Sequence, residues 1–153
     1  MPNIIIYKCP DPASEILISD EESFQVAFID VETTGLFHYK DEIIELALKV
    51  LLIEKRTGKI IRVVSEFESF NEPAKLIDDR ITKLTGISST MVNGKKISWA
   101  TVNENLKDVD LIISHNASFD RPFVDAYSEI SESKLWLHET HVFTYRRDGS
   151  RSA

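Results

Sequence analysis

The sequence holds little cysteine, no long apolar run and fewer basic than acidic residues. Its single cysteine, Cys9, excludes an intrachain disulfide and any zinc site built on several cysteines. We therefore expect a reducing compartment, the cytoplasm. No apolar run approaches the roughly 18 residues that a membrane span requires, so we expect no membrane partner. Because 18 lysine and arginine residues stand against 25 aspartate and glutamate residues, the net charge is −7, and a broad basic surface is not the main means of attracting nucleic acid.

The composition of the 153 residues is that of one ordinary globular domain, with 42% hydrophobic and 28% charged residues. We expect three regions. Residues 1–24 form an N-terminal extension of unknown role, in which Ile4–Tyr7 has the composition of a short edge strand. Residues 25–136 carry the periodic patterns of a folded domain. Residues 137–153 show little periodicity and are expected to be a flexible tail.

Three strands are predicted in the first half of the domain. Residues 25–30 contain a continuous apolar run that stops at polar residues and Gly35, which is typical of a buried strand. Two longer apolar runs, residues 43–53 and 59–70, flank a Thr-Gly pair and predict a β-hairpin. The first of these two runs also fits a helical spacing.

Helices are predicted next along the chain. Helical spacing places Ile77, Ile81 and Leu84 on one face, and Gly86 suits the C-terminal cap of that helix. Ser98 can cap a second helix.

One more strand and one more helix complete the pattern. Residues 110–116 contain a short apolar run typical of a buried strand, and residues 119–130 predict a third helix with Pro122 in its first turn. A hairpin followed by helices and a buried strand predicts an α/β fold, with a mixed parallel and antiparallel sheet flanked by helices.

Two carboxylates lie at the carboxyl end of the first predicted strand. Asp30 and Glu32 are two residues apart, so in an extended chain both side chains project to the same side. Ligands of α/β sheets bind at the carboxyl ends of strands. Two neighbouring carboxylates repel each other unless a cation holds them ionised, and oxygen ligands favour Mg²⁺ or Mn²⁺. The alternative interpretation is two solvated acids in a turn.

A third carboxylate follows the later buried strand. Asp120 lies at the start of the predicted third helix, where the positive end of the helix dipole favours an ionised carboxylate. By itself it could be a helix-capping acid. Two strands that both end in acids suit one shared metal site if the strands are neighbours.

Two of these segments resemble motifs of a known family. Residues 28–36, FIDVETTGL, resemble the first motif of the DEDD (DnaQ-like) 3′–5′ exonucleases, which include the proofreading epsilon subunit of DNA polymerase III and ribonuclease T. Residues 115–120, HNASFD, resemble the second motif. Residues 41–47 and 84–87 are similar to the usual intervening segments. The resemblance extends over about residues 25–136 and implies a ribonuclease H-like fold.

The resemblance implies a two-metal mechanism with Mg²⁺ or Mn²⁺, in which two ions about 4 Å apart clamp the scissile phosphate. Asp30 and Glu32 would hold the ion that activates water, and Asp30 would bridge to the second ion. Asp120 would support the second ion, directly or through water.

The resemblance also implies contacts with the 3′ end of a single strand of DNA or RNA. Residues from both motifs would bind or surround the terminal nucleotide: Thr33, Thr34, Gly35, Leu36, His115, Asn116 and Phe119. Leu36 would wedge against the terminal base. Phe119, judged from its spacing alone, is instead a core residue of its helix.

The family's third motif, His-x₄-Asp or Tyr-x₃-Asp on a later helix, is not found. His141 precedes Asp148 by seven positions, and Tyr145 precedes it by three rather than four. The general base and one metal ligand are therefore unassigned. We expect the fold to be truncated or to have diverged at its C-terminal end.

Three hypotheses follow. The first is a 3′–5′ exonuclease that releases nucleoside monophosphates from single-stranded nucleic acid, with DNA favoured, and that works with a DNA polymerase or another replication or repair protein. The second is a catalytically incomplete exonuclease-like module that binds nucleic acid or a partner protein without cutting. The third is an inactive structural fragment, which predicts no metal affinity.

Overall fold

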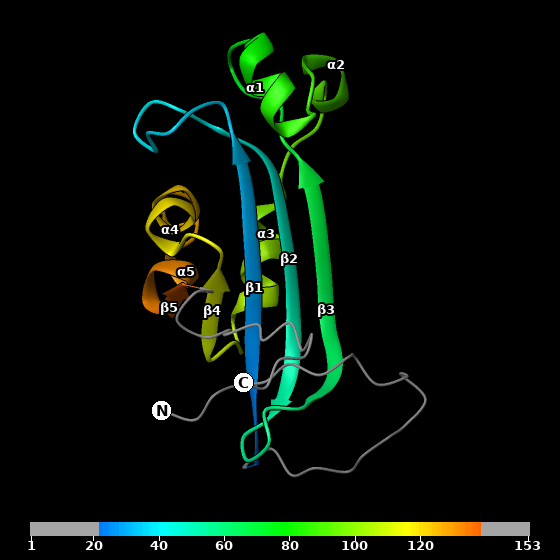
Figure 1. The fold of residues 1–153 in the computed structure, drawn as a ribbon, viewed down its shortest axis with the longest axis vertical. Coiled ribbons are helices and arrows are strands. Elements are labelled where there is room, and N and C mark those ends of the chain that lie inside the picture. Colours follow the sequence, from blue (N-terminus) through cyan, green and yellow to red (C-terminus); the bar gives the residue numbers. More distant parts are fainter. Residues whose placement is uncertain (1–21, 139–153) are drawn as a thin grey trace, which may run out of the picture.

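The computed structural model describes residues 22–138 (Figure 1). They form a five-stranded sheet in the order β3-β2-β1-β4-β5. The strands are β1 (Ser23–Thr33), β2 (Ile43–Glu54), β3 (Ile60–Phe70), β4 (Leu111–Ser114) and β5 (Leu135–His138). The first three pair antiparallel, whereas β1 with β4 and β4 with β5 pair parallel. The expected mixed α/β sheet is therefore confirmed.

The β2–β3 hairpin forms where the Thr-Gly pair predicts it. Gly58 has a φ of 70°, a conformation that costs glycine little and other residues more. Its N–H donates to the carbonyl of Glu54, and the N–H of Glu54 donates to Lys59, both at 2.9 Å. The run 43–53 is thus a strand, because pairing on both sides outweighs its helical spacing.

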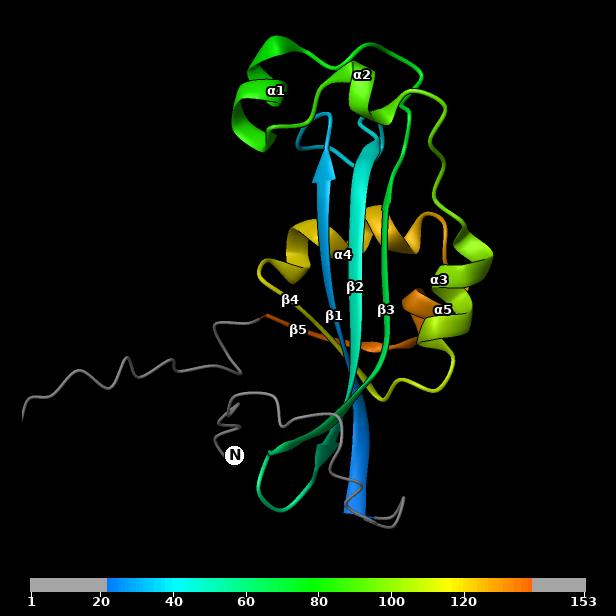
Figure 2. The same ribbon diagram turned by 90° about the vertical axis from the view of Figure 1, so that its right-hand side faces the viewer.

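Five helices cover part of this sheet or extend beyond its end. They are α1 (Asp79–Thr85), α2 (Ser89–Val92), α3 (Trp99–Leu106), α4 (Ala117–Asp125) and α5 (Glu129–Ser133). The short α1 and α2 lie beyond the ends of β1 and β3, whereas α3 and α5 lie on one side of the sheet (Figure 2). Within residues 22–138 no helix has the length and apolar character to cross a membrane.

The two predicted helix caps are present. Gly86 ends α1 with a φ of 79°, and its N–H donates to the carbonyl of Thr82. The Ser98 side chain accepts the N–H of Thr101 at the start of α3. The predicted helical face is wrong in two positions: Ile77 is buried but precedes α1, and Leu84 lies in α1 but is 81% exposed.

The segment predicted as one helix over 119–130 is two helices. α4 ends at Asp125, and Ser128 begins α5 by accepting the N–H of Ser131 at 3.0 Å. A serine whose side chain satisfies a free backbone N–H favours a new helix start over continuation. Pro122 lies in the second turn of α4 rather than the first.

Strand β5 is an addition to the predicted pattern. It includes Leu137 and His138, beyond the domain end expected at residue 136. The expected strand Ile4–Tyr7 and the remainder of the expected tail lie outside the described residues.

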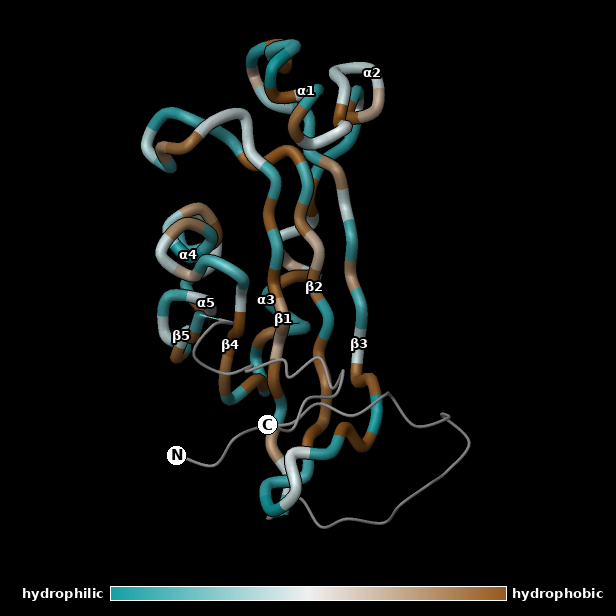
Figure 3. Tube along the Cα trace, in the orientation of Figure 1, coloured by the Kyte–Doolittle hydropathy of each residue, from teal (hydrophilic) through white to brown (hydrophobic). Residues whose placement is uncertain are grey.

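The two faces of the sheet differ in what packs on them. Side chains from α3 and α4 join Ala27, Ile29 and Val31 of β1 in the larger buried cluster. The smaller cluster, which includes Val26 and Ile113, draws its described members from strands alone. Figure 3 shows apolar residues concentrated along β1, β2 and β4. We call the first face the helix-covered face. The second is the carboxylate face, because Asp30 and Glu32 alternate onto it.

Candidate functional site

Strand register sets acidic side chains next to one another on the carboxylate face. Asp30 of β1 pairs with Ala47 of β2, which pairs with Glu68 of β3. In the next row, Glu32 pairs directly with Glu45. Directly opposed residues on neighbouring strands share a face and lie about 4.5–5.5 Å apart at Cβ, so like charges there repel. The hairpin therefore extends the acidic patch beyond β1.

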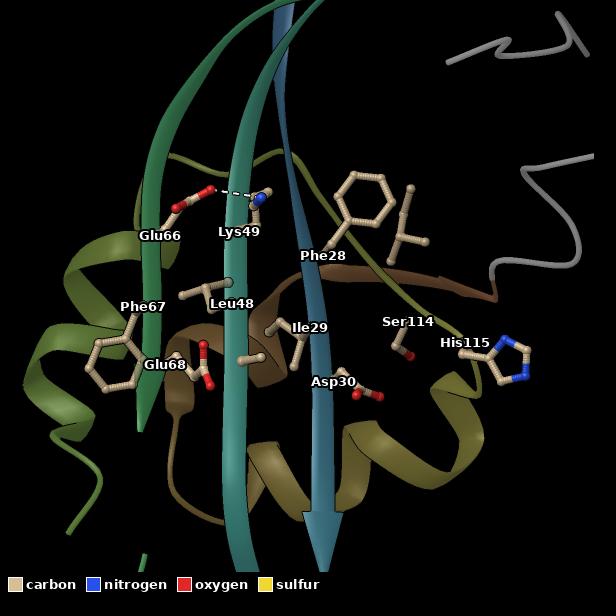
Figure 4. A pocket seen from close by; sticks show the side chains of 12 residues that line it. Phe28, Ile29, Asp30, Leu48, Lys49, Glu66, Phe67, Glu68, Ser114 and His115 are labelled. Carbon is tan, nitrogen blue, oxygen red and sulfur yellow. Dashed lines mark ion pairs between the residues drawn. The ribbon is translucent and has the colours of Figure 1, made fainter. Parts of the chain in front are cut away.

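A hollow of about 670 Å³ lies over the row of Asp30, Ala47 and Glu68 and over the row before it along β1. Phe28, Asp30, Lys49, Glu66 and Glu68 line it from the three long strands, and Ser114 and His115 line it from the end of β4 (Figure 4). Ala47, the smallest side chain of its row, also lines it, so little fills the space between Asp30 and Glu68. The hollow thus opens directly beside Asp30.

The first predicted pair of acids occupies the end of β1. Asp30 is exposed and Glu32 is half-buried. Burial raises the pKa of Glu32 above its ordinary value, and the negative charges of Asp30, Glu45 and Asp120 raise it further. The ionised form of Glu32 therefore lacks compensating positive charge.

Asp120 joins this pair from α4. It lies in the first turn of that helix and is only 3% exposed. Burial raises the pKa of its carboxyl group, and the charge of Asp30 adds to this rise, while hydrogen bonds lower it. One of those bonds comes from the N–H of Asn116, at 3.3 Å. Parallel pairing of β1 with β4 brings Asp120, which follows β4, near Asp30 and Glu32, so the two strands are the neighbours that a shared site requires.

Positive charge is sparse on the carboxylate face. The Lys49 ammonium is 2.7 Å from the Glu66 carboxylate and so compensates that acid (Figure 4). Burial raises the pKa of Glu45, and the charges of Glu68 and Asp30 raise it further. The patch would therefore gain stability from a bound cation.

The donor set suits a hard divalent cation, because every candidate ligand is a carboxylate oxygen. Within residues 22–138, however, no three acidic, histidine or cysteine side chains are arranged so that they could hold a metal ion as they stand.

The buried hydroxyl of Ser114 adds to the polar character of the site. Ser114 is 3% exposed, and its hydroxyl has no hydrogen bond of normal geometry, although its side chain is near enough to lower the pKa of Asp120.

The segment after β1 turns sharply beside the acids. The Thr33 hydroxyl donates to the carbonyl of Gly35 at 2.6 Å, and Thr34 exchanges hydrogen bonds of 2.9 Å with the backbone of Glu42. A Cβ on Gly35 would lie 2.5 Å from a carboxylate oxygen of Asp41, so a larger residue does not fit without movement. Leu36 is 75% exposed. The four predicted residues Thr33–Leu36 therefore form one continuous stretch of chain, which is an edge of the candidate site beside Asp30 and Glu32.

The residues of the second motif take different positions. His115 is exposed and lines the hollow. Asn116 precedes α4, and its side-chain oxygen accepts the Ser118 hydroxyl at 2.9 Å. Phe119 is half-buried, packs against the large cluster and lies 5.1 Å from the Phe123 ring, between centroids. Its contacts are those of a core residue with a partly exposed edge.

Sequence reasoning missed three residues of this region: Glu45, Glu68 and Ser114. The two glutamates lie on the hairpin strands, and only the register shows that they neighbour Glu32 and Asp30. Aligning the hairpin about its Thr-Gly turn would not have revealed them, because two register shifts in the β2–β3 pairing displace Glu68 and because Glu45 meets Glu32 through the β1–β2 pairing. Ser114 gives no signal in the sequence, because its importance depends on burial.

Comparison with known families matches residues 27–148 to a family model, RNase_T, described as "Exonuclease". The DNA polymerase III PolC-type of Latilactobacillus sakei subsp. sakei (strain 23K) is 36% identical over 117 residues, covering 74% of this chain and 8% of that protein. The PolC-type polymerase of Bacillus subtilis (strain 168) is 36% identical over 115 residues, covering 73% and 7%. The chain thus spans less than a tenth of the length of these relatives.

Solved structures resemble the fold. Exonuclease X in complex with 5′ overhanging duplex DNA matches with a TM-score of 0.50 and 22% identity, over 74% of this chain and 58% of that chain. A product-bound exonuclease I matches with a TM-score of 0.61 and 16% identity, over 85% and 34%. E. coli exonuclease I in complex with a dT13 oligonucleotide matches with a TM-score of 0.58 and 17% identity, over 75% and 28%. These likenesses confirm the expected ribonuclease H-like fold.

Proposed function

This chain belongs to the exonuclease family, and from that premise we propose that it is a metal-dependent 3′–5′ exonuclease acting on single-stranded nucleic acid. Family membership confirms the resemblance to DnaQ-like exonucleases and supports a nuclease. The direction of cleavage, the metal ions and the activity of this chain by itself are the parts we propose.

The observation that carries the proposal is the gathering of three carboxylates, two on β1 and one in the first turn of α4, the helix that follows the neighbouring strand β4. Burial raises the pKa of Glu32 most, the charges of Asp30 and Asp120 raise it further, and no lysine or arginine is among the causes that shift it. A divalent cation would relieve this repulsion, so Asp30, Glu32 and Asp120 are the residues that would hold Mg²⁺ or Mn²⁺. When bound, such ions activate water and stabilise the leaving 3′ oxygen.

The chain's own residues would position the substrate. The edge formed by Thr33–Leu36 would bind the terminal nucleotide, with exposed Leu36 against its base. His115 would face the substrate from the wall of the hollow, while Asn116 and Phe119 would shape the site around Asp120. No described residue is assigned as the general base.

DNA is the favoured substrate. Two of the similar structures hold DNA, one a 5′ overhanging duplex and one dT13. The similar sequences are DNA polymerases III of the PolC type, so a DNA polymerase or another replication or repair protein is the partner we propose. The cytoplasmic location stays a prediction from the sequence.

Binding without cleavage is the second candidate function. One observation favours it: neither form of the family's third motif occurs within residues 137–153, after the two matched motifs. Such a module would retain affinity for Mn²⁺ and single strands but release no mononucleotides.

The test is cleavage of 5′-labelled single-stranded DNA and of its RNA counterpart, with Mn²⁺ or with EDTA. Changing a residue that supports a metal ligand costs about 10–100-fold, so Asp30→Ala, which removes a proposed ligand, should cost more than about 100-fold. Because Asp30 is exposed, the variant should fold like the wild type. Asp108→Ala is the matched control, since this exposed aspartate precedes β4, at the end of that strand remote from the site.

The outcomes separate the hypotheses. A metal-dependent ladder of shortened 5′-labelled products, lost in Asp30→Ala and kept in Asp108→Ala, would support the exonuclease. Mn²⁺ binding by calorimetry without cleavage would support the binding module. No Mn²⁺ binding by the folded wild type would refute both.

A further inference from the structure

The loop between β1 and β2 exposes several large apolar side chains. Leu36 is 75% exposed, Phe37 46% and Tyr39 73%, and Lys40 follows them. We call residues 36–40 the aromatic loop. Single exposed apolar residues are ordinary, but an uninterrupted group of this kind marks a binding surface.

The aromatic loop is held by hydrogen bonds, which argues against an accidental exposure of its side chains. The Asp41 carboxylate accepts the N–H of Phe37 at 2.9 Å. The Phe37 carbonyl in turn accepts the N–H groups of Lys40 and Asp41, at 3.0 and 2.8 Å. Rings presented on a fixed loop lose little conformational entropy when a ligand stacks on them.

The aromatic loop lies beside the candidate active site. It begins four residues after Glu32, and the ring centroid of its His38 is 6.2 Å from that of Phe123 in α4. Phe123 follows Asp120 by one turn of that helix. In Figure 1 the connection between β1 and β2, which contains the aromatic loop, lies above α4. Both acid-bearing elements therefore flank it.

Charge in this segment favours an anionic, aromatic ligand. The acids that follow the loop are engaged in the fold, Asp41 with the N–H of Phe37 and Glu42 with the N–H of Ala74, both at 2.9 Å. The Lys40 ammonium lies 4.4 Å from the centroid of the Phe37 ring. Lys40 thus covers one face of the Phe37 ring, and the loop offers the Tyr39 ring, the exposed part of Phe37 and one cation on a protein that is otherwise acidic.

We propose that Phe37, Tyr39 and Lys40 form a stacking subsite for the bases that precede the last two nucleotides at the 3′ end of a single strand. Aromatic rings beside a cation bind successive bases without sequence preference, because every base has a π-face. This inference rests on the proposed function, and it assigns to the aromatic loop the part of the strand that has not yet reached the carboxylates.

Oligonucleotide length provides the test. Fluorescence anisotropy would give the Kd of the full chain for 5′-labelled oligo-dT of two nucleotides and of about eight, within the usual span of a single-strand site. Ca²⁺ would replace Mg²⁺, and gel analysis would confirm that the oligonucleotides stay intact.

The aromatic variants should weaken only the longer oligonucleotide. We expect Tyr39→Ala and Phe37→Leu each to raise the Kd of the longer strand by about 5- to 100-fold, with the dinucleotide changed by less than about twofold. Tyr39→Phe keeps the ring and should bind like the wild type. Lys40→Gln should make the dependence of log Kd on log salt shallower by about 0.7.

Tyr127→Ala is the matched control, because Tyr127 is also exposed, at 52%, but stacks on Trp99, far from the loop in sequence and in contacts. Equal affinity of the wild type and both aromatic variants for the longer strand would overturn the subsite and leave the exonuclease proposal standing. A wild type that binds neither oligonucleotide would overturn the proposed function and the subsite with it.

Discussion

The two faces of the sheet solve different physical problems. On the helix-covered face, Val102 and Leu106 of α3 are fully buried against the strands, and the described core there includes many large apolar side chains. On the carboxylate face, the rows of residues nearest the site carry acids and border the hollow. No helix within residues 22–138 lines that hollow. The same strands thus carry the larger core and its helices on one face, and a smaller apolar cluster followed by acids on the other.

The difference shows how a destabilising site is tolerated. Opposed carboxylates such as Glu32 and Glu45 repel, and their repulsion must be offset elsewhere. Because side chains alternate along each strand, packing on the helix-covered face fixes the backbone that carries Asp30 and Glu32. The acids can therefore remain close without contributing to the core.

A leucine pair gives the largest contrast between the faces. Leu106→Ala should lower the free energy of unfolding by about 2–5 kcal/mol, because Leu106 is fully buried and its truncation leaves a cavity. Leu135→Ala should cost less than about 0.5 kcal/mol, since Leu135 is 63% exposed in β5 and aligns with the carboxylate-face residue Leu111. Urea denaturation measures both. Equal costs would mean that Leu135, on the carboxylate face at the β5 edge, is packed as tightly as the core residue Leu106.

Two buried serines give a smaller contrast: Ser114 lines the hollow of the site, and Ser128 caps α5 on the helix-covered side. Ser114→Ala should raise the stability of the metal-free protein by roughly 1 kcal/mol, because it removes a buried hydroxyl that lacks a well-formed hydrogen bond. Ser128→Ala should lower stability by about 1 kcal/mol, because the Ser128 hydroxyl donates to Asn103 at 2.6 Å and accepts the N–H of Ser131.

Thermal or urea unfolding with and without Mn²⁺ would compare the two serine variants. A loss of stability in Ser114→Ala would show that the hydroxyl is bonded after all, with the Asp120 carboxylate as the nearby acceptor.

Local signals made much of the fold predictable. The hairpin, the Gly86 and Ser98 caps and the buried strand before HNASFD each depend on a few adjacent residues, and each is present. Short elements escaped. α2 has four residues and β5 has four, too few for any periodicity to show. The division between α4 and α5 depends on Ser128, whose capping role competes with a continuous apolar spacing.

The candidate site was predictable only where a motif lies within one segment. Asp30 and Glu32 share a strand, and Asp120 lies in the HNASFD segment, so sequence alone placed all three at strand or helix ends. Glu45 and Glu68 join the patch only through strand register, which depends on pairing between distant segments. The aromatic loop gives no helical or strand pattern, and its relevance depends on exposure and on the contact of His38 with Phe123.

The smallest expected effect is the change in stability on replacing Glu45. It tests whether repulsion among the acids destabilises the carboxylate face. Burial and the charges of Glu68 and Asp30 raise the pKa of Glu45 above 4.5, so between the unfolded and folded pKa values the folded protein binds more protons. Stability should therefore fall as pH rises through the folded pKa of Glu45.

Glu45→Gln should stabilise the metal-free protein at neutral pH by about 0.2–0.5 kcal/mol after solvent screening, and less at high salt. Below pH 4.5 the variant and the wild type should be equal. Glu66→Gln removes a carboxylate that Lys49 already compensates, so urea titrations should show no gain for that control. A gain of equal size in both variants would trace the effect to overall net charge rather than to the arrangement of acids beside Asp30.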